Sequence, residues 1–272
     1  MRYLFIFLFV SCTCYSQIDG SEITNKTFAP AVLQYEGVIH YGEVQSMGLA
    51  GPVGPEYNAI LVFNLKQSLF VTRKDSLEGG NINGLHSYDT PTDSRAVPIY
   101  TNEKGFKYFQ DLSKNRLYSR DIGFTYVKEP IPQINWKIYP VTKRIGKFKV
   151  KKATAYFRGR EYTAWYTTEI PLPFGPWKLN GLPGLILEAY DTNREIYWYF
   201  KNYQEVSPVP LKQIDDGGNQ WMNFQQYRSK LLQAYQNMKH TSSRAADKND
   251  FTSDHKMKMS DIYIENFGTY EN

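Results

Sequence analysis

The feature that most constrains this fold is a long series of short strand-like segments with no helix-like segment between them. Each is rich in β-branched and aromatic residues and ends at Gly, Pro, Asn or Asp, which is typical of strands and hairpins. The clearest hairpin joins residues 148–157 to 161–170 through Arg158-Gly159-Arg160. A second pair, 185–190 and 195–206, turns at 191–194. Short turns between consecutive strands predict an antiparallel meander.

Further segments extend the series toward the N-terminus. Residues 59–74 read as two strands that turn around 64–67, and residues 75–96, rich in Gly, Asn, Asp and Ser, read as a long loop. The other predicted strands lie in residues 35–44, 104–111, 115–129 and 134–141, the last closed by Pro140.

The segment "EIYWYFKNY", residues 195–203, carries large side chains on both faces of its strand. Strand alternation places Ile196, Trp198 and Phe200 on one face and Tyr197, Tyr199 and Tyr203 on the other. A sheet with one face in water would not show this pattern, so each face needs a cover. Because twisted sheets of many strands curl or close, we expect a β-rich α+β fold with a curved antiparallel meander sheet. By analogy, we expect a half-open barrel like that of the periplasmic lipoprotein carriers.

One helix is predicted, near residues 219–238. Apolar side chains recur there at spacings of three and four, and Asn219 can cap the helix after Gly217-Gly218. The helix would cover one face of a single domain that spans residues 17–238. Residues 239–272 form a polar tail in which 261–267, "DIYIENF", could add a last edge strand.

The N-terminus has the pattern of a secretory signal peptide, residues 1–16. Arg2 precedes an unbroken apolar run at 3–10 that is too short to span a membrane. Cleavage near Ser16 would export the chain to the periplasm or outer membrane, or secrete it, with no transmembrane span. It would also remove Cys12 and Cys14, leaving no thiol. Lipidation at Cys12, which would anchor the chain to a membrane, is the alternative.

Residues 171–184 form an unusual connection that is rich in proline, glycine and large apolar residues. In Leu182-Pro183-Gly184-Leu185 the Pro-Gly pair predicts a type II turn with positive φ at Gly184. Solvent-exposed loops are rarely this apolar, and long connections usually have a task. The loop is either a static plug that completes the core or a stiff flap that serves as a lid or a docking surface.

Residues 144–191 resemble the GLPGLI family, named for the string at 181–186. The shared features, in order, are Ile-Gly at 145–146, Lys-Ala at 152–153, Phe-Arg-Gly-Arg at 157–160, Ala-Trp at 164–165, Glu-Ile-Pro at 169–171 and Gly-Pro-Trp at 175–177. The resemblance implies an exported protein of Gram-negative bacteria, often encoded near outer-membrane receptor systems. It implies no established activity and no catalytic residues. Many members carry a cysteine where this chain has Val150.

The residues favour no enzyme class. There is no Gly-x-Ser-x-Gly motif, the histidines at 40, 86, 240 and 255 are scattered, and no glycine-rich phosphate loop occurs. Glu161 and Glu169 would lie about 26 Å apart on one strand, too far for a glycosidase pair. Basic residues read as dispersed, which argues against nucleic acid, and the tip "FRGRE" reads as a solvated turn. His255, Met257 and Met259 have soft ligand atoms that suit copper(I), although a lysine-rich tail with incidental methionines is the favoured explanation.

We therefore expect a non-catalytic envelope protein without a cofactor. It would bind a hydrophobic ligand, lipid-like or peptide-like, in a concave aromatic face. Trp165, Trp177 and Trp198 would line or gate that face, and Leu182, Pro183 and Gly184 would form its rim. Alternatively, Phe174, Trp177 and Leu179 would dock an outer-membrane receptor or transport partner through the loop at 171–184.

Overall fold

The computed structural model describes residues 36–49, 51–80, 84–90, 93–206, 211–215, 218, 220–249 and 258–267. All of them belong to one compact unit, Gln34–Asn272. The predicted signal peptide, with Cys12 and Cys14, lies outside the described residues. So does Asn219, the predicted helix cap.

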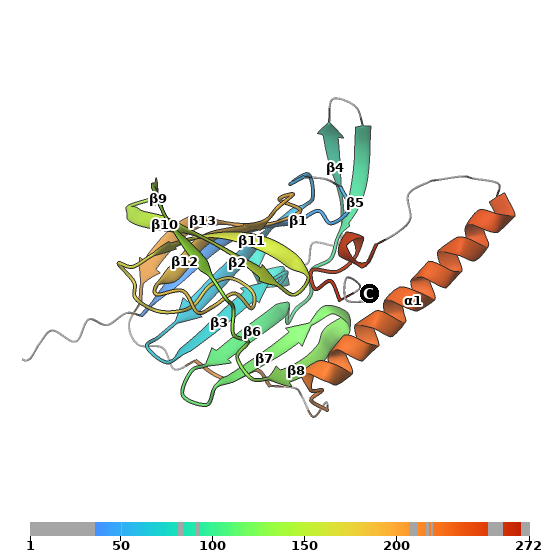
Figure 1. Ribbon diagram of the computed structural model, residues 1–272. Coiled ribbons are helices and arrows are strands. Elements are labelled where there is room, and N and C mark those ends of the chain that lie inside the picture. The colour runs from blue at the N-terminus through green and yellow to red at the C-terminus, as the bar shows by residue number, and fades with distance from the viewer. Residues whose placement is uncertain are drawn as a thin grey trace, which may run out of the picture. The chain divides into compact units, whose positions relative to one another are not determined.

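Eleven strands form one antiparallel sheet that does not close into a barrel (Figure 1). This confirms the expected fold class. In sheet order they are β8 (Thr125–Glu129), β7 (Arg116–Asp121), β6 (Phe106–Asp111), β3 (Gln67–Thr72), β2 (Glu56–Phe63), β1 (Gly37–Gln45), β13 (Ile196–Glu205), β12 (Leu185–Asp191), β11 (Arg160–Thr167), β10 (Phe148–Phe157) and β9 (Lys137–Ile145).

The centre of the sheet is a pair of strands that are far apart in sequence. β1 pairs with β13 from Gly37 opposite Glu205 to Gln45 opposite Ile196. This pair joins two meanders, one from β1 to β8 and one from β9 to β13, into a single sheet. Hairpin patterns predict each meander, but they do not predict this long-range pairing.

Two sequence expectations need correction at the strand level. The loop expected at 75–96 contains a short 3₁₀ turn, η1 (Asp75–Leu77), and then a separate hairpin of β4 (Gly84–Thr90) and β5 (Asp93–Ile99). The strand expected to close at Pro140 continues to Ile145. Because β9 is an edge strand, an outward-facing proline there need not break a ladder hydrogen bond.

The two faces of β13 are occupied differently. Ile196 and Trp198 are fully buried in the core, whereas Tyr197 and Tyr199 are half-buried on the opposite face. A bulge against β1 at His40/Tyr41 shifts the register, and Tyr203 packs against Phe148 at 5.6 Å between ring centroids. Tyr203 therefore leaves the set of side chains that strict alternation had assigned to it.

The core on the inner face of the sheet includes the loop between β11 and β12. Large side chains from strands at both ends of the sheet form one cluster with loop residues Ile170, Leu172, Phe174, Trp177, Leu179 and Leu182. Each of these loop side chains is less than a tenth exposed. The loop thus packs as part of the core, as the static-plug interpretation predicts.

The helix α1 (Phe224–Asn249) begins later and ends later than expected. Asn223 caps it: the Gln226 backbone N–H donates to Asn223 Oδ1 at 2.9 Å, and the Asn223 N–H donates to Gln226 Oε1 at 2.8 Å. This reciprocal pair is a capping box built with asparagine and glutamine. Tyr227 and Leu231 pack against Val127 of β8. In the described part of the chain, no helix combines the length and apolarity needed to cross a bilayer.

The C-terminal segment, residues 258–267, forms no strand, contrary to the edge strand expected at 261–267. It starts with a 3₁₀ turn, η3 (Met259–Asp261), and continues as irregular chain. Its backbone donates one hydrogen bond to the β10–β11 turn, from Asn266 N to Arg158 O at 2.9 Å. Side-chain contacts replace a strand ladder here, and several of them involve buried charges.

Candidate functional site

Most of the residues predicted to line or dock a ligand are buried in the hydrophobic core. Trp177 stacks on Trp198 with ring centroids 6.0 Å apart and planes 15° apart. Phe174, Leu179 and Leu182 are at most 1% exposed, so the loop presents none of these side chains as a docking surface.

The remaining predicted site residues lie elsewhere. Trp165 is separate from the tryptophan stack and lies under the Lys143 ammonium, 4.3 Å from the ring. Pro183 is exposed, and Gly184 beside it is buried. Trp165 belongs to the same core cluster as Trp177 and Trp198, although no ring contact joins it to that pair among the described residues.

Gly184 serves a different purpose from the predicted one. Its φ is not among the positive values, whereas Gly181 has φ 88°. A Cβ on Gly184 would lie 2.0 Å from the backbone oxygen of Thr167. Glycine is thus required for close approach of two backbone segments, and the predicted type II turn with positive φ at Gly184 is wrong.

The least expected side chain in this loop is Lys178, which is fully buried. Its Nζ lies 2.9 Å from Asp121 Oδ2, 2.9 Å from Glu265 Oε1 and 3.8 Å from Glu129 Oε1. The three carboxylates come from β7, β8 and the C-terminal segment. A charge inside an apolar stretch was the available sequence signal, because a buried lysine requires partners.

Arg158 completes this buried cluster of charges. It pairs with Glu129 Oε2, and its Nε lies 3.6 Å from Glu265 Oε1. Three carboxylates thus share two cations. Burial alone would lower the pKa of Lys178, but the surrounding carboxylates raise it above its usual range. Burial raises the pKa of Glu265, while Lys178 and Arg158 act in the opposite direction. Burial is the largest cause of the raised pKa of Glu265, and the neighbouring carboxylates of Asp121 and Glu129 add to it.

The β10–β11 turn that carries Arg158 is not the solvated tip expected from "FRGRE". Arg158 and Gly159 have φ values of 51° and 80°, as a two-residue type I′ turn requires. A Cβ on Gly159 would lie 1.8 Å from the backbone oxygen of Asn266. The C-terminal segment therefore covers the turn directly, a contact that local sequence patterns do not reveal.

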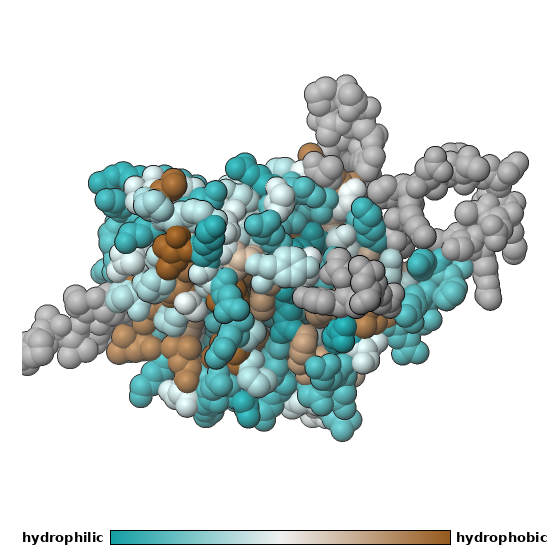
Figure 2. Space-filling model, in the orientation of Figure 1, coloured by the Kyte–Doolittle hydropathy of each residue, from teal (hydrophilic) through white to brown (hydrophobic). Residues whose placement is uncertain are grey.

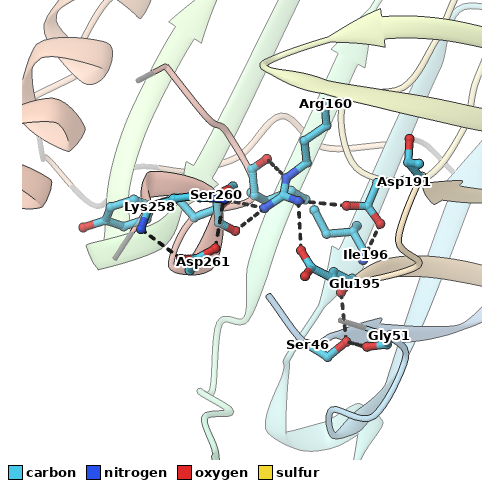
Figure 3. Close-up of polar contacts among 12 residues, drawn as sticks. Ser46, Gly51, Arg160, Asp191, Glu195, Ile196, Lys258, Ser260 and Asp261 are labelled. Carbon is cyan, nitrogen blue, oxygen red and sulfur yellow. Dashed lines mark hydrogen bonds and ion pairs between the residues drawn. The ribbon is translucent and has the colours of Figure 1, made fainter. Parts of the chain in front are cut away.

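Arg160, the next residue after the turn, holds the same segment (Figure 3). Its guanidinium donates to Asp191 Oδ2 at 2.8 Å and reaches Glu195 Oε2 at 3.4 Å. It also donates to the backbone oxygens of Ser260, Tyr263 and Ile264. One arginine thus satisfies two buried carboxylates and three otherwise free carbonyl groups.

A cavity of about 360 Å³ lies between the start of α1 and the C-terminal segment. Its lining residues are Arg158, Phe224, Gln225, Arg228 and Phe267.

The phenylalanine rings and arginines of this cavity contact one another. The two rings meet edge to face with centroids 5.7 Å apart, and the Arg158 guanidinium lies 3.6 Å from the centroid of Phe224. The Arg228 guanidinium lies 5.7 Å from Phe267 and has no carboxylate partner among the residues described. The cavity thus offers apolar ring faces beside an unneutralised cation.

The suggested copper ligands do not come together in the described region. Met259 is buried, and its Sδ accepts the Phe267 backbone N–H at 3.3 Å. His255 and Met257 lie outside the described residues. Across the residues that are described, no group of three or more His, Cys, Asp or Glu side chains is placed to hold a metal ion.

Comparisons with known proteins give little beyond a family of unknown function. A family model described as "Protein of unknown function (Porph_ging)" matches residues 158–188, which include Arg158, Arg160 and Lys178. No curated protein matched the chain.

Two solved structures are similar in part. "Structure of PNGF-II in C2 space group" has 14% identity and TM-score 0.46 over 71% of this chain. "Structure of PNGF-II in P21 space group" has 16% identity and TM-score 0.47 over 72%. This chain covers about a third of each, 32% in both cases.

Proposed function

We propose that this protein is an exported, non-catalytic binding protein of the cell envelope that holds a small apolar carboxylate. Its site would be the cavity lined by Phe224, Phe267, Arg158 and Arg228. The proposal keeps the hydrophobic ligand expected from the sequence but moves it away from the concave aromatic face. The side chains of the protein's own loop already pack there.

The observation that carries the proposal is the Arg228 guanidinium, which lines the cavity without a carboxylate partner in the described structure. Arginine pairs with carboxylates through two parallel hydrogen bonds, a geometry that gives both affinity and orientation. The phenylalanine rings would contact the apolar part of the ligand, and about 360 Å³ falls in the lower range of small-molecule sites.

Arg158 would act differently from Arg228. Its side chain is only 9% exposed, and two carboxylates compensate its charge from behind. Its guanidinium lines one side of the cavity, stacks on the Phe224 ring and holds that ring in place. Export, which the signal peptide pattern predicts, would place this cavity where envelope lipids and peptides occur.

The test uses decanoate as the probe and decanol as its uncharged control, with affinity measured by calorimetry on the full mature chain. We expect decanoate to bind at least tenfold more tightly than decanol, and Arg228→Gln to remove that difference. Arg144→Gln, an exposed arginine outside the cavity, should leave binding unchanged. Equal binding of acid and alcohol, or no effect of Arg228→Gln, would refute the proposed site.

Native mass spectrometry of the protein from its own envelope addresses the natural ligand. A co-purifying apolar acid that the Arg228→Gln variant lacks is the expected result. A co-purified neutral lipid retained equally by both forms would contradict the proposal.

A further inference from the structure

The β9–β10 hairpin concentrates positive charge. Between residues 137 and 152 there are seven basic side chains and no acidic one, so this hairpin carries more positive charge than the formal net charge of +5 of the whole chain. The seven are Lys137, Lys143, Arg144, Lys147, Lys149, Lys151 and Lys152. The expectation of dispersed basic residues is therefore wrong, because many of them lie on two adjacent strands.

Among the described residues, most of this charge has no carboxylate partner. Lys143 pairs with Glu188 at 2.8 Å, but the other six residues form no ion pair with a carboxylate in the described part of the chain. Arg144 lies directly opposite Lys149 in the strand register, and both are exposed. Like charges in directly opposite positions destabilise a sheet. The Glu169 carboxylate accepts the Lys149 backbone N–H at 2.7 Å, but it forms no ion pair with the Arg144 or Lys149 side chain in the described structure, so both cations remain open to an external anion.

Large apolar side chains are exposed on the same two strands. Ile138 is 49% exposed, Val141 51% and Tyr156 55%, and they make up three of the seven large hydrophobic residues exposed in the described structure. Figure 2 shows isolated hydrophobic patches among hydrophilic side chains in the region of β9 and β10. The hairpin thus combines cations with aliphatic and aromatic groups.

The position of the hairpin leaves it accessible. β9 is one edge of the eleven-stranded sheet, and only β10 pairs with it. At the opposite edge, Met222 forms backbone hydrogen bonds with β8, and α1 packs on β8. No described element covers β9 in the same way.

We infer that the β9–β10 hairpin docks the protein on an anionic membrane surface. Basic side chains near such a surface are attracted by its negative potential. Exposed aliphatic and tyrosine side chains then insert at the boundary between headgroups and acyl chains. The apolar residues favour a lipid surface over nucleic acid, which offers phosphates but no apolar layer. An acidic protein is the alternative partner, and the experiment distinguishes it from an anionic membrane.

The test is co-sedimentation of the full mature chain with vesicles. Vesicles of phosphatidylglycerol and phosphatidylethanolamine supply the anionic surface, and vesicles of phosphatidylcholine are the neutral control. We expect the partition coefficient to be at least tenfold higher on the anionic vesicles. It should fall as the salt concentration rises from about 50 to about 500 mM, because salt screens the attraction between the basic side chains and the lipid headgroups.

Two matched variants test the role of the hairpin. Lys147→Gln/Lys149→Gln/Lys151→Gln removes three positive charges from it, and Lys66→Gln/Lys104→Gln/Lys212→Gln removes three from exposed positions elsewhere. We expect the first to lower anionic-vesicle binding at least tenfold and the second to change it less than threefold. Ile138→Ser/Val141→Ser should weaken the binding that persists at high salt.

Three results would overturn the inference. The first is absence of binding to anionic vesicles by the natural chain. The second is an equal loss of binding in both triple variants, which would indicate an effect of net charge only. The third is binding to a soluble acidic protein that the hairpin variant abolishes while vesicle binding stays intact. Circular dichroism of each variant verifies that the sheet is retained.

Discussion

Lys178 Nζ lies 2.9 Å from Glu265 Oε1, although 87 residues separate them, and neither side chain is exposed. The pair connects the proline-rich loop to the C-terminal segment. Because Asp121 and Glu129 share the same ammonium group, the contact belongs to a network and not to an isolated pair.

The first prediction concerns this network. Lys178→Met leaves buried carboxylates without their central cation, so it should lower the free energy of unfolding by about 3–5 kcal/mol. Urea denaturation measures the change. In the double variant Lys178→Met/Glu265→Gln one unpaired carboxylate is also removed, so its loss should be smaller than the sum of the single losses by about 0.5–3 kcal/mol. Strict additivity would contradict the proposed coupling.

The second prediction concerns the clamp at Arg160. Arg160→Met leaves Asp191 and Glu195 buried without their shared cation and should cost about 3–5 kcal/mol of unfolding free energy. It also frees three carbonyl groups of the C-terminal segment, so hydrogen exchange at residues 258–267 should accelerate before the rest of the chain opens. Arg144→Met, at an exposed position, should change the free energy of unfolding by no more than about 0.5 kcal/mol. Unchanged exchange in the Arg160 variant would argue against the clamp.

The third prediction separates two glycines of the same loop. In Gly184→Ala the new methyl group meets the Thr167 backbone oxygen, and we expect a loss of about 2–3 kcal/mol. In Gly181→Ala nothing lies within 4 Å of the added Cβ, so only the positive φ of 88° is penalised, by about 1–2 kcal/mol. Thermal or urea unfolding of both variants shows which substitution lowers the stability more. A larger loss at Gly181 would show that φ, and not close approach, dominates.

The fourth prediction concerns Glu43, a fully buried carboxylate on β1. Burial raises its pKa above the ordinary 4.5, although the charge of Arg73 and the hydrogen bond that the Gln45 amide donates to Glu43 Oε1 oppose the shift. A raised pKa in the folded state means that the folded protein binds more protons than the unfolded chain. The contribution of Glu43 to stability therefore falls as pH rises from about 4.5 through its folded-state pKa.

Glu43→Gln, which does not titrate, should remove this part of the pH dependence. In urea denaturation, we expect the variant and the natural protein to have similar free energies of unfolding near pH 4. Toward pH 8 the free energy of unfolding of the variant should rise above that of the natural protein. Glu103→Gln, at an exposed position, should show no such relative gain. A relative loss toward pH 8 would mean that the carboxylate is stabilised by Arg73 in its charged form.

Much of the local structure was predictable because it is encoded within a few residues. The two-residue turn at Arg158-Gly159 follows from the conformational freedom of glycine, and the alternation from Ile196 to Tyr199 follows from the two-residue period of a strand. The three-and-four spacing around Tyr227 and Leu231 predicted α1 for the same reason. Its first residue was misplaced because Asn219 and Asn223 can both cap a helix.

The β-rich class, an antiparallel meander and the helix could be predicted from the amino-acid sequence, because side-chain period and turn conformation depend on neighbours along the chain. The pairing of β1 with β13, the contact between Lys178 and Glu265, and the cover of Arg158 and Arg160 by the C-terminal segment appear only in the folded chain. So does the cavity between α1 and that segment. These contacts join residues separated by dozens of positions, and their partners are selected by burial and by the need to neutralise each buried charge, neither of which leaves a local pattern.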